Sequence, residues 1–155
     1  MLTAARAAQD GANLSDCATL AEKARANSGL FFAVDTLEYL HRGGRIGGAQ
    51  KFMGTLLNMK PILALEDGKV EGLERIRTKT RAHERVLELI IEKTKGKTPI
   101  RLATLHANAP EDAKAMLTKA EKELNPVESI FSGVSPVVAN HAGPGTVGLA
   151  YMAGI

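Results

Sequence analysis

The sequence predicts an α/β fold with a mixed β-sheet of about five or six strands packed against helices. Three observations predict it. Short apolar runs of strand length alternate with longer segments whose apolar residues recur at the helical period. The pair Asp67-Gly68 joins two such runs and is the strongest hairpin signal in the chain. The length, 155 residues, is enough for one domain with a real hydrophobic core.

The N-terminal part of the chain is predicted to form two helices. An alanine-rich segment ends at Gly11, and Ser15 is placed to cap a second helix that runs to about Asn27. Cys17 is the only cysteine, so no intramolecular disulfide can form, which is typical of a reducing, intracellular compartment. Cys17 shares its helical face with small apolar residues, so we expect its thiol to pack as a core residue.

A glycine-rich corner follows a predicted strand at residues 30–34. Asp35 and Glu38 have the spacing of a capping box and predict a short helix over Thr36–Arg42, which the pair Gly43-Gly44 would end. A second glycine pair then precedes a second predicted helix. The apolar stripe of that helix recurs at the helical period and consists of Ala49, Phe52, Met53, Leu56 and Leu57.

Arg45 lies between the two glycine pairs of this corner, and two interpretations fit it. Backbone N–H groups exposed at a helix N-terminus, together with an arginine, can hold an anion such as a carboxylate or phosphate. Alternatively, the glycines only permit a sharp change of direction between two helices, and Arg45 is solvated. The residues of the corner favour neither interpretation over the other.

The rest of the chain alternates strands and helices. A buried strand at residues 62–65 turns at Asp67-Gly68 into a partner strand that runs from Lys69 to Arg77. A helix over Thr80–Lys95 follows, and Gly96 stops it. The elements that complete the domain are a strand at Ile100–Leu105, a helix from Pro110 to Leu124, a strand at Val127–Phe131 and a last strand at Val147–Tyr151.

Basic residues concentrate in the middle third of the chain. Arg75, Arg77, Lys79 and Arg81 alternate, so they would point to one side while the chain stays extended. A solvated polar face is the favoured interpretation, and an anion-binding site is the alternative. A nucleic-acid-binding module that uses the stretch Arg75–Arg85 is a rival hypothesis, although the chain has no tryptophan and few other aromatic residues for base stacking.

A second glycine-rich segment precedes the last strand. Residues 140–145 are predicted to form a tight loop that exposes its backbone. His141 in this loop either has a structural role, which is the commoner case for a lone histidine, or donates to an oxyanion from its ring. Gly143, Gly145 and Gly148 match G-x-G-x-x-G, but too few residues follow for the helix and acidic residue of a dinucleotide site, so nucleotide binding is rejected.

Patterns for catalysis and metal binding are absent from the sequence. The four histidines are scattered, and the lone cysteine cannot complete a zinc site with them. No Gly-x-Ser-x-Gly or Cys/His arrangement indicates an activated nucleophile. No run of residues has the length and apolarity of a bilayer-spanning segment, and the N-terminus lacks the apolar core of a secretory signal, which together predict a cytoplasmic protein.

A set of segments carries a resemblance to a known family. The segments are DTLEYLHRGGRIGGAQKFMGTLLNMKPIL, the EDGKV hairpin, RIRTKTRA, LHANAPEDA and the terminal HAGPGTVGLAY. Together they resemble the C-terminal half of the DegV family of bacterial fatty-acid-binding proteins, and the resemblance covers nearly the whole chain. It implies a DegV C-terminal-domain-like α/β fold, a long-chain fatty acid as ligand, no cofactor, and a lipid-binding carrier rather than an enzyme.

The resemblance also implies site residues. His141 matches the family histidine near the acyl carboxylate, and Gly143 belongs to the same head-group region. Arg45 matches an arginine connected with the head group or with the kinase-facing surface, where Arg42 accompanies it. The residues expected to line the tail pocket, each of which could instead serve the core, are Ile46, Phe52, Leu56 and Phe131.

Partners follow from the resemblance in the same way. Family members have two α/β domains, bind one fatty acid between them, and in some cases present it to a fatty acid kinase that makes acyl phosphate. The family's N-terminal domain is expected before residue 1. Residues 1–28 are then helices of the inter-domain boundary, and residues 29–155 are the C-terminal lipid-binding domain. A further alternative is an isolated structural or oligomerisation domain whose exposed former interface favours self-association.

Overall fold

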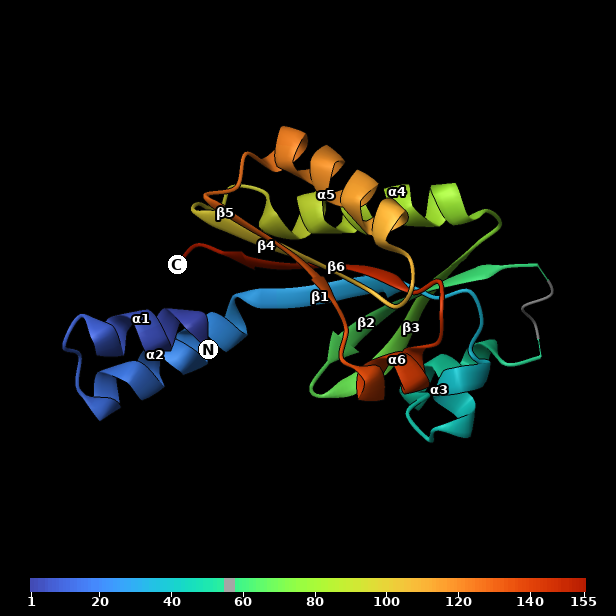
Figure 1. Cartoon of the computed structure of the whole chain (residues 1–155), viewed down its shortest axis with the longest axis horizontal. Helices are drawn as coiled ribbons and strands as arrows, with labels where there is room; N and C mark the ends of the chain where they lie inside the picture. The colour runs from blue at the N-terminus through green and yellow to red at the C-terminus, as the bar shows by residue number, and fades with distance from the viewer. Residues whose placement is uncertain (55–57) are drawn as a thin grey trace.

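The computed structural model describes residues 1–54 and 58–155. Its centre is one mixed sheet (Figure 1) made of six strands, which are β1 (Ser28–Ala33), β2 (Lys60–Glu66), β3 (Lys69–Ile76), β4 (Ile100–His106), β5 (Glu128–Gly133) and β6 (Val147–Ala153). Across the sheet the order is β3-β2-β1-β6-β4-β5. Neighbouring strands are antiparallel except β4 and β5, which are parallel. The predicted α/β fold with a mixed sheet is confirmed.

Two long helices, α4 (Lys79–Thr94) and α5 (Pro110–Leu124), cover one face of this sheet (Figure 1). The hydroxyl of Thr78 caps α4 by accepting from the N–H of Arg81 (3.3 Å). Pro110 stands in the first turn of α5, where its missing N–H leaves no donor unsatisfied. The apolar stripes of both helices pack on alternate strand residues and form the main core, whose fully buried members include Ile62, Val86, Ile90, Val147 and Leu149.

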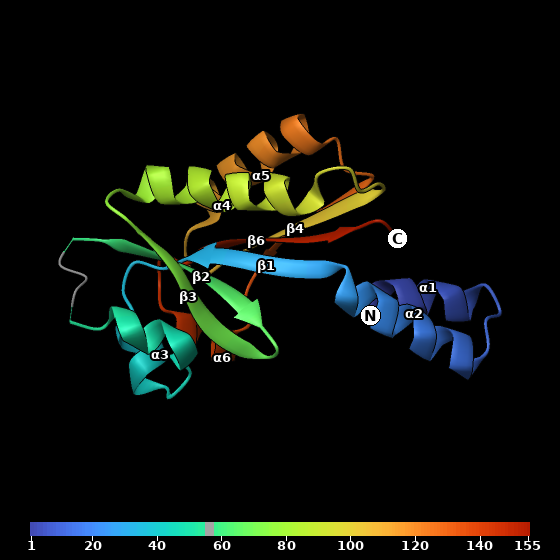
Figure 2. The same cartoon turned by 180° about the vertical axis from the view of Figure 1, so that it is seen from behind.

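The opposite face carries two separate groups of helices. At one end lie α1 (Leu2–Gln9) and α2 (Leu14–Ala26), and at the other lie α3 (Glu38–Arg42), the 3₁₀-helix η1 (Gly47–Phe52) and α6 (Pro136–Ala142) (Figure 2). A smaller apolar cluster joins α3 and η1 to the sheet and consists of Phe32, Val34, Leu37, Leu40, Ile46, Ala49 and Leu63. Because side chains alternate along β1, Phe31 faces α4 while Phe32 faces this second cluster.

The hairpin between β2 and β3 has the predicted turn. Asp67 and Gly68 both have positive φ, +46° and +76°, as a type I′ turn requires. The strands and helices from β3 onward otherwise differ by at most two residues at either end from the predicted bounds, with the exception of α6.

Two predicted helix caps are wrong. Asn13 rather than Ser15 caps α2, because its Oδ1 accepts from the N–H of Asp16 (3.0 Å). Asp35 does not cap α3, which begins only at Glu38. The carboxylate of Asp35 pairs instead with Lys60 on β2 (Oδ1 to Nζ, 2.8 Å), a contact between distant parts of the sequence that a local capping pattern cannot reveal.

The helix predicted after the glycine corner is also shorter than expected. The 3₁₀-helix η1 ends at Phe52, Met53 is 39% exposed, and Gly54 has a φ of +79°. A Cβ at Gly47 would stand 2.2 Å from the carbonyl oxygen of Val70, so this segment lies flat against β3. Close packing on the strand therefore replaces the expected amphipathic helix, and Leu56 and Leu57 of its predicted stripe lie outside the described residues.

The N-terminal helices reach past the end of the sheet (Figure 1). Cys17 on α2 is consequently only half-buried, with its Sγ 3.8 Å from the carbonyl oxygen of Ala12, so the expected core position is wrong. Within residues 1–54 and 58–155, none of the helices has both the length and the apolarity needed to cross a bilayer.

Candidate functional site

The two glycine-rich segments of the sequence meet where α3 contacts α6. A Cβ at Gly43 would stand 2.0 Å from Nδ1 of His141, and a Cβ at Gly143 would stand 2.4 Å from Cδ2 of Tyr39. Each helix thus packs one ring on the glycine that directly follows the other helix: His141 of α6 on Gly43, and Tyr39 of α3 on Gly143. This reciprocal packing brings the two segments together and requires both glycines, because any side chain there would displace a ring.

His141 lies in the last turn of α6, so its prediction within a loop is wrong. The sequence contains a helix-start signal here, Ser135 followed by Pro136, but the glycines that come after it favoured the prediction of a loop. Nδ1 of His141 is buried and finds no hydrogen-bond partner among the described residues. Since Nδ1 faces Gly43, Nε2 is the ring nitrogen that remains for a ligand.

Arg45 is exposed and comes two residues after Gly43, the residue on which the His141 ring packs. Its backbone N–H donates to the carbonyl oxygen of Leu40, and its Nη1 donates to the carbonyl oxygen of Gly43, both at 2.9 Å. The guanidinium makes no ion pair within the part of the chain that the structure describes. Arg45 therefore holds a positive charge near His141 that no described carboxylate neutralises.

Gly143 has a packing role in this arrangement. Its N–H donates to the carbonyl oxygen of Ala139 (2.8 Å), and its own carbonyl accepts from the hydroxyl of Thr146 (2.8 Å). Both backbone groups are therefore already hydrogen-bonded. Gly143 matters because it has no side chain, which leaves room for the Tyr39 ring. Its φ of +83° also favours glycine.

Sequence reasoning missed Asp35 and Lys60 as supports of this region. The Oδ2 atom of Asp35 would lie 2.0 Å from a Cβ at Gly145, so its carboxylate packs directly on the turn that follows α6. The N–H of Gly145 donates to the carbonyl oxygen of Ala107 (2.8 Å), which ties the same turn to the end of β4. No local pattern in the sequence pairs Asp35 with Lys60.

The residues predicted to line the tail pocket do not form one wall. Ile46 is buried and Phe52 is partly buried in the second apolar cluster. Phe131 pairs with Thr104 in the register of β4 and β5, and its ring lies 5.4 Å from that of His106, on the side of the sheet that α5 covers. Phe131 therefore cannot share a wall with Ile46 and Phe52, and Leu56 lies outside the described residues.

A groove that sequence reasoning missed lies on the same sheet face as α3 and α6, next to α1. Its volume is about 590 Å³, and its apolar lining includes Leu30, Leu65, Ala103, Ile130, Ala150 and Met152. At its edge Arg6 and Glu128 form two hydrogen bonds, of 2.8 and 2.6 Å, that attach α1 to β5. Strand periodicity signals these lining positions, but it does not say which face of the sheet stays open.

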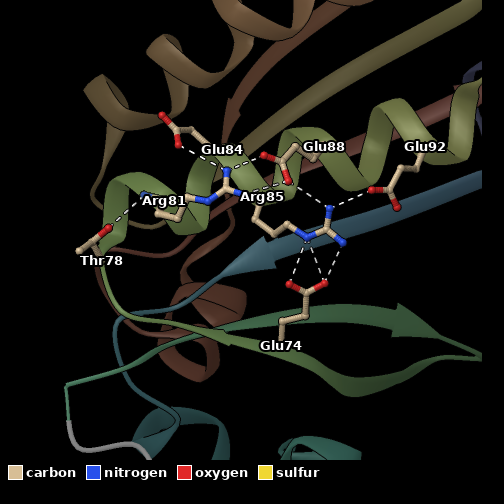
Figure 3. A network of polar contacts seen from close by, with 7 residues as sticks. All are labelled: Glu74, Thr78, Arg81, Glu84, Arg85, Glu88 and Glu92. Carbon is tan, nitrogen blue, oxygen red and sulfur yellow. Dashed lines mark hydrogen bonds and ion pairs between the residues drawn. The ribbon is translucent and has the colours of Figure 1, made fainter.

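Two arginines of the basic stretch, Arg81 and Arg85, pair with glutamates of the protein (Figure 3), and Lys79 pairs with Asp112 (2.7 Å). Arg85 contacts Glu74 (2.9 Å), Glu92 (2.8 Å) and Glu88 (3.1 Å), and its hydrogen bonds, with that to Glu74 the strongest, raise its pKa. Arg81 binds Glu88 (2.5 Å), and this hydrogen bond, followed by that from Arg85, lowers the pKa of the Glu88 carboxyl. The network engages the guanidinium groups of Arg81 and Arg85 that phosphate contacts would need, and the rival nucleic-acid hypothesis is not favoured.

The fold and the site define the chain as an α/β domain that carries an apolar groove and a paired-helix corner on the same face of its sheet. The described residues contain no group of three or more His, Cys, Asp or Glu side chains that could hold a metal ion. A family model described as an uncharacterised protein of the DegV family matches residues 1–154. The chain belongs to the DegV family.

Curated relatives support this membership over nearly the whole chain. A DegV domain-containing protein of Streptomyces coelicolor is 38% identical over 149 residues, which cover 96% of this chain and 53% of that protein. Another, from Clostridium acetobutylicum, is 40% identical over 150 residues, which cover 97% of this chain and 52% of that protein. The chain spans about half the length of the curated relatives that it matches.

Solved structures of the family share the fold. A DegV family protein from Thermus thermophilus, described by its fatty acid binding, superposes with a TM-score of 0.93 at 35% identity, covering 98% of this chain and 55% of that one. DegV from Bacillus subtilis, described as a fatty acid binding protein, gives 0.84 at 33% identity, covering 98% and 54%. The expected family and the expected α/β fold are confirmed, and the descriptions of both solved relatives name fatty acid binding.

Proposed function

We propose that this chain binds a long-chain fatty acid as one half of a two-domain carrier. The carboxylate lies at the junction of α3 and α6, and the acyl tail lies along the open sheet face. The fatty-acid binding described for the Thermus thermophilus and Bacillus subtilis proteins supports the ligand class. The observation that carries the proposal is the His141 ring, which is held against Gly43 with Nδ1 buried and no partner for it among the described residues.

The chemistry of the junction suits a carboxylate. His141 donates to it from Nε2, and Arg45 offers the guanidinium N–H groups that Gly43 does not take. Hydrogen bonds to an ionised acceptor such as a carboxylate are roughly twice as strong as bonds between neutral groups. Gly143 completes the head-group region by admitting the Tyr39 ring.

The open sheet face suits the tail. The groove beside α1 offers about 590 Å³ lined largely by apolar side chains. Burial of an acyl chain gains about 0.8 kcal/mol per CH₂, so the tail supplies most of the affinity and the carboxylate contacts set its orientation. In this arrangement Ile46 and Phe52 shape the sheet side of the mouth, near the end of η1.

The remaining part of the carrier is proposed from the shared length. Because the chain spans about half of its relatives, a second domain supplies the opposite wall of the lipid pocket. Residues 1–28 then form the boundary region, and residues 29–155 form the lipid-binding domain. The carrier works in the cytoplasm and presents its carboxylate to a fatty acid kinase, with Arg42 and Arg45, both exposed, on the surface that meets the kinase.

Lipid extraction tests the proposed ligand. The 155-residue chain is produced alone and fused to the unmatched half of the Streptomyces coelicolor relative, and both are extracted with solvent and analysed by mass spectrometry. We expect about one long-chain fatty acid per fused molecule and a smaller amount on the chain alone. A fused protein that is empty and also fails to bind added palmitate would defeat the proposal and leave a structural or oligomer-forming domain as the explanation.

Acyl-phosphate formation tests the proposed partner. A fatty acid kinase and ATP are added to the lipid-loaded fused protein, and acyl phosphate is quantified. Product that depends on the carrier supports the kinase partnership. Lipid binding without any product would retain the carrier and remove the kinase.

A further inference from the structure

Thr146 is a buried hydroxyl that contacts the end of the helix carrying His141. Its side chain is only 1% exposed. Its Oγ1 donates to the carbonyl oxygens of Gly143 (2.8 Å) and Ala142 (3.0 Å), the two residues that immediately follow His141. The single hydroxyl proton is therefore shared between two carbonyls at the end of α6.

These two carbonyls need an external donor. The last four C=O groups of an α-helix have no partner within the helix, and α6 has only seven residues. Ala142 and Gly143 are both buried, so water is not freely available to them. An unsatisfied buried acceptor is costly, and a short helix has few other hydrogen bonds with which to hold its geometry.

Thr146 is itself held in place from the sheet. Its carbonyl oxygen accepts from the N–H of Ala107 (3.0 Å), and the preceding Gly145 donates to Ala107 (2.8 Å). Ala107 directly follows β4. The path from the sheet to His141 therefore runs through two backbone hydrogen bonds, the Thr146 hydroxyl and the last turn of α6.

We propose that Thr146 is a positioning residue for His141: its hydroxyl fixes the end of α6 and so keeps the ring on Gly43 with Nε2 directed at the ligand. The expected effect on fatty-acid binding rests on the proposed function, whereas the expected effect on the position of the His141 ring does not. Thr146 thus joins the site as a residue that never contacts the fatty acid.

The chain offers a matched control in Thr104. This threonine is equally buried, at 1% exposed, but its Oγ1 has no hydrogen-bond partner among the residues that the structure describes. Replacing either threonine with valine removes a hydroxyl at nearly constant volume. Only Thr146→Val removes a donor from the end of α6.

Four variants and one double variant test the inference by the affinity for palmitate in the fused protein. Thr146→Val should weaken palmitate binding about tenfold, because the two buried carbonyls at the end of α6 lose the donor that they share. Thr146→Ser should restore most of it, and Thr104→Val should leave it unchanged. In a His141→Ala background, Thr146→Val should add almost no further loss, because the ring through which it acts is gone. An equal loss in both backgrounds would overturn the inference.

A second readout separates this inference from the proposed function. The side-chain ¹⁵N signals of His141 report the environment and tautomer of its ring, and the other three histidines serve as references in the same spectrum. Thr146→Val should shift the His141 signals while Thr146→Ser and Thr104→Val leave them in place. If the wild-type protein binds no fatty acid, the proposed function fails and these signals still decide: an unmoved His141 signal in Thr146→Val overturns the positioning role. Thr146→Cys, with a weaker donor, replaces Thr146→Val if that variant does not fold.

Discussion

The ring of His141 occupies the space that a side chain at Gly43 would need, with Nδ1 only 2.0 Å from where the Cβ would be. Tyr39 and Gly143 repeat the relationship in the opposite direction. Two helices of five and seven residues, too short to be stable alone, are thereby fixed against each other by two ring-on-glycine contacts. The position of the His141 ring therefore depends on both helices, and a substitution at the end of α3 should displace a side chain on α6.

Gly43→Ala should therefore displace the His141 ring. Gly43 has a φ of −79°, so alanine suits the backbone and only the clash with the ring matters. Overpacking of this kind costs about 1–3 kcal/mol, and we expect palmitate binding to weaken by about tenfold or more. Displacement of a fluorescent fatty acid measures the change.

Gly44→Ala is the matched control for this variant. At Gly44 a Cβ would meet nothing within 4 Å, but φ is +66°. Alanine there strains the backbone by about 1–2 kcal/mol without touching the ring. Stability should fall while palmitate binding persists. Equal losses of binding in both variants would show that the ring contact is not what matters.

His141→Ala and Arg45→Ala should each weaken palmitate binding. Loss of a hydrogen bond to a charged group costs about 1.5–3 kcal/mol, so we expect about a 10- to 100-fold loss for His141→Ala. Arg45 is exposed, and its loss should cost about fivefold at low salt and less at high salt. Lys114→Ala, an exposed cation on α5 across the sheet, is the control. Unchanged affinity in both site variants would remove the site assignment.

Arg85→Ala should destabilise the protein more than Arg81→Ala. The side chain of Arg85 is 22% exposed and joins β3 to α4 through Glu74, whereas that of Arg81 is 51% exposed and pairs within its own helix. We expect Arg85→Ala to lower the free energy of unfolding by about 1–2 kcal/mol, because the carboxylate of Glu74 loses its partner. Urea unfolding of both variants measures the difference. A larger effect for Arg81→Ala would contradict this ranking.

Stability should fall in mild acid because of His83. Its Nε2 is buried and unpartnered within residues 1–54 and 58–155, and burial, partly opposed by Asp112, lowers the pKa of the ring from 6.5. As the pH falls, His83 therefore binds a proton in the unfolded chain at a higher pH than in the folded protein. The free energy of unfolding therefore decreases as the pH drops below about 6.5 and levels off below the folded pKa.

His83→Gln should reduce this acid sensitivity. Urea unfolding of the variant and the wild type at about pH 7.5 and about pH 5.5 isolates the contribution of His83, since glutamine does not titrate. The decrease between the two pH values should be smaller in the variant. The same decrease in both proteins would assign the acid sensitivity to other groups.

Most of the fold could be predicted because its signals are local. The Asp67-Gly68 turn and the apolar runs beside it are read from neighbouring residues, and β2 and β3 lie where they were expected. Asp35 shows where this fails. Its spacing to Glu38 matches a capping box, but its carboxylate binds Lys60, and nothing near Asp35 in the sequence reveals that partner.

The candidate site could be predicted only in part. The glycines marked both segments that meet at the α3–α6 contact, because glycine clusters are visible in a sequence. Which ring each glycine admits depends on packing between distant segments, and so the pairs Gly43 with His141 and Gly143 with Tyr39 could not be predicted. Phe131 illustrates the same limit, since the apolar pattern of a strand does not say which face of the sheet each residue joins.

The place of β6 in the sheet has a consequence for how the protein is made. β6 comes last along the chain, yet it lies between β1 and β4 and pairs with both. Until residues 147–153 have left the ribosome, β3-β2-β1 and β4-β5 are two half-sheets with open edges. Such long-range pairing slows folding, and open edges invite association with other nascent chains. A premature stop before β6 would thus remove the strand that joins β1 to β4 and leave both of these strands without a neighbour that the complete sheet gives them.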